Sequence, residues 1–379
     1  MNEINKYISE NNYKKALNEC IRSNNNHLGK LLSIIISKNN SKIADDLIQQ
    51  FDSNIKGLQT EGDVIVEEYM VDNVENPPLL SEDDDDDNEK IIRVKLLGNW
   101  CTPEQLRESC GKMTKGNYTW NNIRLVLDND PDYFVVINSP PKGESPEPSK
   151  TIIFQMDPYM GEKNSWGEWT SPDPKKFFRV CTHSNDYNEW YLNKTYQELK
   201  TMNIVKTEDV ISTVLSDKYS DSGDIKRIDF VKFCESKGMS VHVFGSDKWG
   251  YMDYKGSLPN HENDKAMFPY KYVFNCENIS IKNYYTEKII DAILSECLCF
   301  YSGCYNIREY IDERAYVYLE LSNFEDDYQK VKKAIEGNLW EERIDIIRKE
   351  KKKILDYLSF CPRLERIINK TEDQEYEEQ

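Results

Sequence analysis

The segment from Tyr270 to Gly303, YKYVFNCENISIKNYYTEKIIDAILSECLCFYSG, predicts a strand, a polar loop, a helix and a second strand. The apolar run Tyr272 to Cys276 is typical of a buried strand, and Thr286 can cap a helix whose apolar residues recur at helical spacing. In an open α/β sheet, ligands bind where strands end and helices begin, because a helix N-terminus presents unpaired N–H groups to an anion. We therefore expect a binding site at this junction. The polar residues that fall there are Glu277, Asn278, Tyr284, Glu287 and Lys288.

Length and charge restrict the class of protein. A chain of 379 residues is long enough for two α/β domains with large cores. Its formal net charge of −18 argues against a general nucleic-acid binder, which needs a basic surface to neutralise phosphates. No apolar run reaches the roughly 18 residues that span a bilayer, and the N-terminus has no signal-peptide core. We expect a cytoplasmic protein with no membrane span and no nucleic acid as partner.

The sequence offers no convincing metal site. The ten cysteines form no CxxC pair, and only four histidines occur. A site made of Cys297, Cys299 and Cys304 would place its ligands on a helix end and the following strand, which fits a zinc knuckle poorly. The DxD sequence Asp128 to Asp130 is more typical of a turn, and the acidic run Glu82 to Asp87 of a solvated linker. We predict that no metal is bound.

Apolar spacing divides the chain into a helical module, an acidic linker and two halves in which strands and helices alternate. The helical module is expected to pack on the rest of the chain, with recruitment of a protein partner as the alternative. The predicted strands are 91–97, 133–138, 151–156, 210–215, 241–245, 272–276 and 315–319, and the predicted helices include 103–112, 189–202, 225–237 and 340–358. The predicted domains are the helical module 1–55, the linker 56–90, Rossmann-like units at 91–204 and 205–360, and an acidic tail 361–379.

The block from Tyr270 to Tyr318 resembles the α1,3/α1,4-fucosyltransferase family. In that family an aromatic strand, Glu-Asn, a short polar loop, Tyr-x-Thr-Glu-Lys and an apolar helix follow one another, and here the same order reads YVFNCENISIKNYYTEKII. Upstream, VLSDKYSDSGDIKRIDFVKFCESKGMSVHVFG is similar to the family's strand, Arg-x-x-Phe helix and glycine-ended strand, which nominates Arg227. The resemblance is clearest over residues 205–335 and is absent from residues 1–90.

The resemblance implies a GT-B fold, in which two Rossmann-like domains face each other across a cleft and the C-terminal domain binds a nucleotide sugar. It implies an inverting enzyme that transfers fucose from GDP-fucose to a hydroxyl of a glycan acceptor, with no metal or other cofactor. Such a donor carries a diphosphate, whose departing charge needs cations and helix-terminal N–H groups. Arg227 and Lys288 supply the cations, and Glu287 can accept hydrogen bonds from ribose hydroxyls. The donor-binding residues so nominated are Arg227, Asn278, Tyr284, Glu287, Lys288 and Glu277.

Inverting transfer also needs a base that takes the proton of the acceptor hydroxyl. Asp157, which follows a predicted strand of the N-terminal unit, is the first candidate, although the family more often has a glutamate in this region. Glu162 and Glu168 remain rivals. Three tryptophans can line an acceptor site or pack in the core: Trp166, Trp169 and Trp190.

Two alternatives stay open. The chain can be a glycosyltransferase of the same fold that uses another nucleotide sugar. It can also be a catalytically silent member of the family whose N-terminal helices and acidic surface serve protein interaction.

Overall fold

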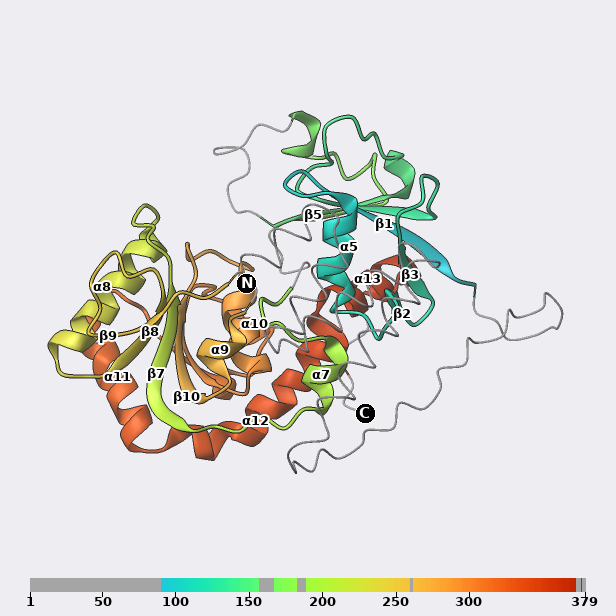
Figure 1. The fold of residues 1–379 in the computed structure, drawn as a ribbon. Helices are drawn as coiled ribbons and strands as arrows, with labels where there is room; N and C mark the ends of the chain where they lie inside the picture. Colours follow the sequence, from blue (N-terminus) through green and yellow to red (C-terminus); the bar gives the residue numbers. More distant parts are fainter. Residues whose placement is uncertain (1–89, 157–166, 183–188, 260–261, 373–375, 377–379) are drawn as a thin grey trace, which may run out of the picture. The chain divides into compact units, whose positions relative to one another are not determined.

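The computed structural model describes residues 90–156, 167–182, 189–259, 262–372 and 376 (Figure 1). The predicted helical module and nearly all of the predicted linker lie outside these residues. So do three of the residues discussed above, which are Asp157, Glu162 and Trp166.

The N-terminal unit is built on a six-stranded sheet with the order β2-β3-β1-β4-β5-β6. All neighbouring strands of this sheet are parallel, except β2 and β3, which are antiparallel. Helix α5 begins with a capping box, because Thr102 and Gln105 bond each other's backbone N–H groups. The elements are β1 (Ile92–Gly98), α5 (Pro103–Gly111), β2 (Thr119–Trp120), β3 (Ile123–Val126), β4 (Tyr133–Ile137), β5 (Thr151–Gln155), β6 (Arg179–Thr182) and α7 (Tyr196–Thr201), with 3-10 turns at Pro148–Lys150 and Gly167–Trp169.

The C-terminal unit is a second six-stranded sheet, entirely parallel, with the order β12-β11-β10-β7-β8-β9. Its strands are β7 (Glu208–Leu215), β8 (Val241–Gly245), β9 (Asp253–Gly256), β10 (Tyr270–Cys276), β11 (Leu298–Ser302) and β12 (Tyr316–Tyr318). Its helices are α8 (Ser222–Ser236), α9 (Asp264–Met267), α10 (Glu287–Leu294), α11 (Phe324–Glu336) and α12 (Leu339–Lys353), with 3-10 turns at Ile307–Glu309 and Glu313–Ala315.

Helices cover both faces of the second sheet. Helices α8 and α11 lie on one side and α9 and α10 on the other (Figure 1). On the first side, Phe230 contacts both Phe274 of β10 and Phe324 of α11, with ring centroids 5.2 and 5.5 Å apart. On the second side, Ile289, Ile290 and three further apolar α10 residues are fully buried, which fits the apolar character of its sequence.

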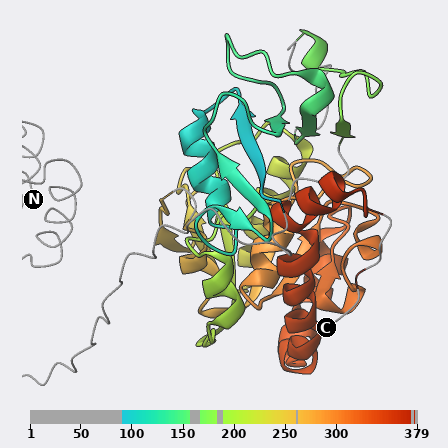
Figure 2. The same cartoon turned by 90° about the vertical axis from the view of Figure 1, so that its right-hand side faces the viewer.

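After α12 the chain forms a π-helical turn at Ile354–Leu358, bends, and ends in α13 (Phe360–Asn369), as the red ribbon shows (Figure 2). Helix α13 packs on the N-terminal unit: the rings of Phe360 and Phe154 lie 5.8 Å apart, and the Trp120 indole donates to Glu365 Oε2 at 2.9 Å. Residues 361–369 therefore form a packed helix rather than part of an acidic tail. The sequence interpretation missed it because its buried face is short.

The predicted fold class, α/β with two Rossmann-like units, is confirmed by these two sheets, in which all neighbouring strands except β2 and β3 are parallel. The cleft between the units stays a prediction. One predicted helix is wrong over half its length. The prediction placed a helix at 189–202, but only Tyr196–Thr201 is helical. The backbone N–H groups of Tyr191 and Asn193 bond the distant carboxylates of Asp291 and Asp264 instead of forming helical turns.

Candidate functional site

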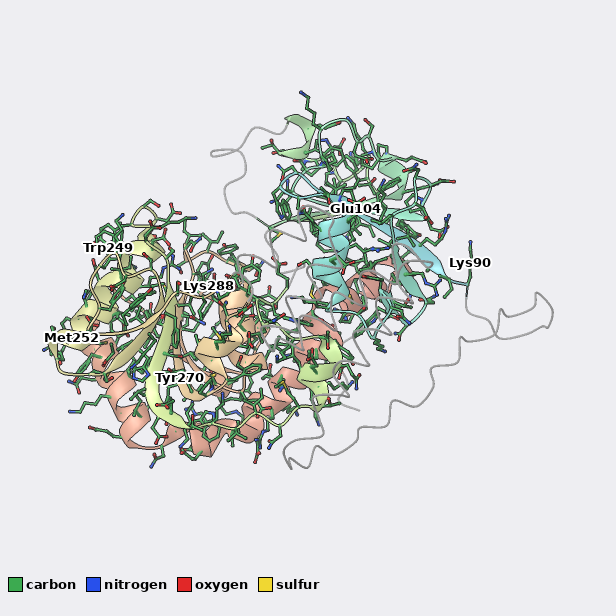
Figure 3. All side chains as sticks on the ribbon, in the orientation of Figure 1. Lys90, Glu104, Trp249, Met252, Tyr270 and Lys288 are labelled. Carbon is green, nitrogen blue, oxygen red and sulfur yellow. The ribbon has the colours of Figure 1, made fainter. Side chains whose placement is uncertain are left out.

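The second sheet has a topological switch point between β7 and β10. From β7 the chain proceeds through α8 to β8 and β9 on one side, and then returns to β10 on the other side of β7. The connection that follows β7 leads through α8 to β8, and the connection that follows β10 leads through α10 to β11 on the opposite side. These two connections part at the carboxyl ends of β7 and β10 and leave room for a ligand there. Lys288 lies at this end of the sheet, opposite Tyr270 at the start of β10 (Figure 3).

A cavity of about 250 Å³ occupies this switch point. Residues from Thr213 to Ser216 of β7 and the following loop line it, together with Asn275 and Cys276 of β10. Arg227 of α8 and the first α10 residues, Glu287 and Lys288, complete the polar part of the wall. Three predicted donor-binding residues, which come from two segments far apart in the sequence, thus meet at one cavity.

Lys288 is held between two carboxylates. Its Nζ lies 3.0 Å from Glu287 Oε1 and 3.5 Å from Glu277 Oε2, and it also donates to Thr286 Oγ1 at 3.2 Å. Although burial favours the neutral amine, Glu287 and Glu277 raise the pKa of Lys288. Burial likewise opposes ionisation of Glu287, but Lys288 outweighs it and lowers the pKa of that carboxyl. Lys288 and Glu287 are therefore both charged at neutral pH.

Glu277 lies behind this pair and does not reach the cavity. It is 1% exposed, and it accepts hydrogen bonds from Thr286 N at 2.9 Å, Thr286 Oγ1 at 2.8 Å and the Tyr301 hydroxyl at 3.1 Å. Burial raises the pKa of Glu277, while Lys288 opposes the rise. Glu277 thus fixes the residue that caps α10 and the ammonium beside it.

Arg227 is 8% exposed, and some of its guanidinium N–H groups have weak hydrogen bonds or none. It forms an ion pair with Asp224 one turn earlier in α8. Its contacts to Cys276 O, Asn278 Oδ1 and Ser216 Oγ measure 3.4 to 3.5 Å, at the limit of a hydrogen bond. Its Nε is buried and has no partner among the described residues. A buried guanidinium N–H without an acceptor is costly unless a ligand supplies one.

Asn278 and Tyr284 support the cavity without lining it. Asn278 accepts the long contact from Arg227, and its carbonyl accepts the Gly223 N–H at 3.0 Å. Tyr284 is 9% exposed and lies close enough to Lys288 to affect its pKa. Their assignment to direct donor contact stays a prediction.

Two glycines let the backbone come close at this corner. A Cβ on Gly223 would lie 1.9 Å from Glu277 O, and a Cβ on Gly303 would lie 2.3 Å from Glu277 Cγ. Neither position accepts a side chain without movement of the backbone. The start of α8, the end of β10 and the end of β11 are therefore packed together around Glu277.

The sequence interpretation missed several residues of the wall. Asn275 interrupts the apolar strand β10, and its Nδ2 donates to Lys288 O at 2.6 Å, so a polar residue in an apolar run was the available signal. Tyr191 and Asn263 also line the cavity. Tyr191 lies in the segment predicted as a helix at 189–202, and no element was predicted around Asn263. Nothing in the local sequence indicates that they meet α10.

The residues proposed for the acceptor side are placed only in part. Asp157 lies outside the described residues, so its role as base stays a prediction. Trp190 is 5% exposed and its indole donates to Lys194 O at 2.9 Å, which makes it a packing residue. Trp169 packs against Phe177, with ring centroids 5.3 Å apart.

Neither a metal cluster nor a membrane helix is found in the part of the chain that the structure describes. There, no three His, Cys, Asp or Glu side chains gather in a way that would hold a metal ion. Asp128 and Asp130 of the DxD sequence bond Arg93, through the Asp128 carboxylate and the Asp130 carbonyl. None of the described helices combines the length and apolar character needed to cross a bilayer.

No protein-family model and no curated protein matches the chain. Among solved structures, it is similar to an α1,3-fucosyltransferase with GDP, at 15% identity and a TM-score of 0.40 over 76% of this chain and 95% of that chain. It is also similar to an α1,3-fucosyltransferase with GDP-fucose, at 17% identity and a TM-score of 0.40 over 69% of this chain and 84% of that chain. A third similar structure is an α-glucosyltransferase in complex with UDP-glucose and DNA containing an abasic site, at 11% identity and a TM-score of 0.49 over 73% of this chain and 99% of that chain.

Proposed function

We propose that this protein is a glycosyltransferase that transfers fucose from GDP-fucose to a glycan hydroxyl with inversion. The observation that carries the proposal is the meeting of Arg227, Glu287 and Lys288 at one cavity, located at the switch point of a parallel sheet. The GDP-fucose donor comes from the resemblance of the segment around Glu277 to Lys288 to the fucosyltransferase family.

The cavity suits the diphosphate and ribose of the donor. Ligand sites for a whole drug-sized molecule usually measure about 300–1,000 Å³, so a cavity of about 250 Å³ holds only part of a nucleotide sugar. The diphosphate would lie between Arg227 and Lys288, at the N-terminus of α10. Glu287 would accept a hydrogen bond from a ribose hydroxyl.

Both cations already have carboxylate partners, and this restricts how the diphosphate binds. Asp224 pairs with Arg227, and Glu277 and Glu287 pair with Lys288. These partners hold the cations in place before the donor arrives, which lowers the entropy cost of binding. The donor's oxygens would take over the long contacts of Arg227 and its unpartnered Nε, while the Asp224 ion pair stays intact.

In the reaction, the bond between the sugar's anomeric carbon and the diphosphate breaks as the acceptor hydroxyl attacks the opposite face. Negative charge then grows on the departing diphosphate. Arg227, Lys288 and the N–H groups of α10 would stabilise this charge, and such preorganised groups act most strongly where water is excluded. The acceptor's proton would pass to a carboxylate of the N-terminal unit, with Asp157 as our candidate.

A donor screen by calorimetry tests the proposal, with GDP, GDP-fucose, GDP-mannose and UDP-sugars as ligands of the full chain. The proposal predicts binding of GDP-fucose and GDP. A preference for a uridine donor would replace fucose by another sugar nucleotide. No measurable binding of any nucleotide would instead favour the silent, protein-interacting alternative.

Transfer to glycan acceptors tests the base. Asp157→Asn is expected to retain donor binding and to lose transfer, because the amide cannot take the acceptor's proton. Glu168→Gln tests the rival candidate and is expected to keep turnover, since Glu168 is an exposed residue of a 3-10 turn. Turnover that persists in Asp157→Asn and disappears in Glu168→Gln would move the role to Glu168.

A further inference from the structure

A buried carboxyl without a cation lies one turn after Glu287 in α10. Asp291 is 0% exposed, and no described lysine, arginine or histidine lies within ion-pair distance of it. Burial raises the pKa of Asp291 well above its ordinary value, and the charges of Glu287 and Glu189 act in the same direction. Its neighbours in α10, Ile290 and Ala292, are apolar and fully buried, and an apolar residue in its place would avoid the cost of burying a carboxyl. A polar residue kept at such a cost needs a reason.

The two hydrogen-bond donors to Asp291 explain why a carboxyl is present here, because both belong to residues that line the cavity. Asp291 Oδ1 accepts the backbone N–H of Tyr191 at 2.9 Å, and Oδ2 accepts Asn263 Nδ2 at 2.9 Å. Tyr191 and Asn263 belong to segments about 100 and 28 residues away from Asp291 in sequence. One carboxyl thus joins three separate parts of the cavity wall.

The same two segments are also joined to each other. Asn263 N donates to Tyr191 O at 3.0 Å, and Asn193 N donates to Asp264 Oδ1 at 3.2 Å. Tyr191 and Asn193 lie in the connection between the last strand of the N-terminal sheet, β6, and helix α7. The described part of this connection, residues 189–195, which we call the strap, therefore lies at the edge of the candidate donor site, with Asp291 as its buried anchor.

We propose that Asp291 is a positioning residue that fastens this connection to α10 and so sets the place of the Tyr191 ring in the wall of the donor cavity. The inference rests on the proposed function, since it assigns Tyr191 to the binding of the nucleotide sugar. The class of ligand it addresses is the sugar part of the donor, either the ribose or the transferred sugar. An aromatic ring in the wall offers an apolar face to the C–H groups of a sugar ring.

The surroundings of the Tyr191 hydroxyl agree with this placement. The hydroxyl donates to Glu189 Oε1 at 3.2 Å. Burial, followed by the charges of Glu189 and Glu287, raises the pKa of Tyr191, so the hydroxyl stays protonated at neutral pH. The ring is therefore fixed at both ends, by its own hydroxyl and by the backbone N–H that Asp291 holds.

A double-mutant cycle tests the inference. Calorimetry with the nucleotide sugar that binds the wild-type chain most tightly is run on wild type, Asp291→Ala, Tyr191→Ala and the double variant. If Asp291 acts through Tyr191, each single variant weakens binding about tenfold and the double variant is no weaker than either single one. Effects of residues that act independently would multiply. Multiplied effects, or unchanged affinity of Asp291→Ala, would overturn the proposal.

Two further variants separate positioning from general stability. Asp291→Asn should restore most of the affinity that Asp291→Ala loses, because an amide can keep both bonds once the Asn263 amide turns over. Asp345→Ala, an aspartate of α12 whose side chain is 95% exposed, is the matched control and should bind as wild type does. If Asp291→Ala does not fold, Asn263→Ala replaces it in the cycle, with the same coupling expected. Absence of binding to the wild-type chain would overturn the proposed function itself, a result distinct from a missing Asp291 effect.

Discussion

Replacement of Gly223 by alanine tests how closely the start of α8 packs on the end of β10. The new Cβ would lie 1.9 Å from Glu277 O and 2.7 Å from both the carbonyl carbon and oxygen of Asn278, all of them backbone atoms. Because ordinary carbon contacts need about 3.5 Å, the helix would have to move by about 1.5 Å. That movement would also lengthen the hydrogen bond from Gly223 N to Asn278 O.

Three effects decide the sign of the change. Overpacking costs about 1–3 kcal/mol, and loss of the backbone hydrogen bond costs about 1 kcal/mol more. Higher helix propensity of alanine returns at most about 1 kcal/mol. Gly223→Ala should therefore lower the free energy of unfolding by about 1–3 kcal/mol, although propensity alone predicts a gain.

Urea unfolding at equilibrium measures this difference, as a lower midpoint with an unchanged slope. Gly98→Ala is the matched control, since its Cβ would meet only side-chain atoms of Trp100 and Leu106, the closest at 3.2 Å. That control should stay within about 0.5 kcal/mol of wild type. Equal or greater stability of Gly223→Ala would refute the packing described for this corner. Donor binding should weaken along with stability, because Asn278 contacts Arg227.

Three further changes follow from the charges of the C-terminal unit. Lys288→Ala should weaken nucleotide-sugar binding by about 10- to 150-fold in calorimetry, because it removes a charge-assisted hydrogen bond; unchanged affinity would contradict the site. Burial raises the pKa of Glu277 above 4.5, so the folded chain holds this proton to a higher pH than the unfolded chain does. The free energy of unfolding should therefore fall as the pH rises from the pKa of Glu277 in the unfolded chain to its pKa in the folded chain. Glu277→Gln should remove this part of the pH dependence in denaturant titrations, and identical pH profiles of variant and wild type would disprove it. Lys351→Met should destabilise the chain by about 3 kcal/mol in urea unfolding, because the buried Glu296 carboxylate loses the Lys351 ammonium at 2.9 Å. A loss under about 1 kcal/mol would show that the ion pair of Glu296 with Arg348 is enough to stabilise the buried carboxylate.

Local patterns predicted the framework of the C-terminal unit well. The apolar runs at 210–215, 241–245 and 272–276 correspond to β7, β8 and β10, and Thr286 caps α10 as expected. These elements are readable because the burial of a strand or helix face is written in neighbouring residues. The polar residues that follow these apolar runs could be predicted as candidate donor-binding residues, because the runs show where the strand ends and the helix begins.

What escaped prediction depends on contacts between distant residues. The segment around Tyr191 has a composition that suits a helix, yet its N–H bonds Asp291, 100 residues later. Asn263 reaches the cavity only because α10 and the strap meet there. The short strands β3, β6 and β9 have four residues each, too few to show a period against their surroundings.

Glu277 shows a second limit of reading residues one by one. Its place beside Asn278 suggested contact with the donor, but its side chain is buried and serves Thr286, Tyr301 and Lys288. Sequence identifies a polar residue at the right end of a strand. Only the packing of Gly303 and β11 shows that this carboxylate faces inward.

A crystal structure of the chain with a bound nucleotide sugar tests the central claim most directly. The account predicts diphosphate oxygens within about 3 Å of Arg227 and Lys288, at the N-terminus of α10, with Asp224 still paired to Arg227. A diphosphate bound at another place, with the switch-point cavity between β7 and β10 empty, would contradict it.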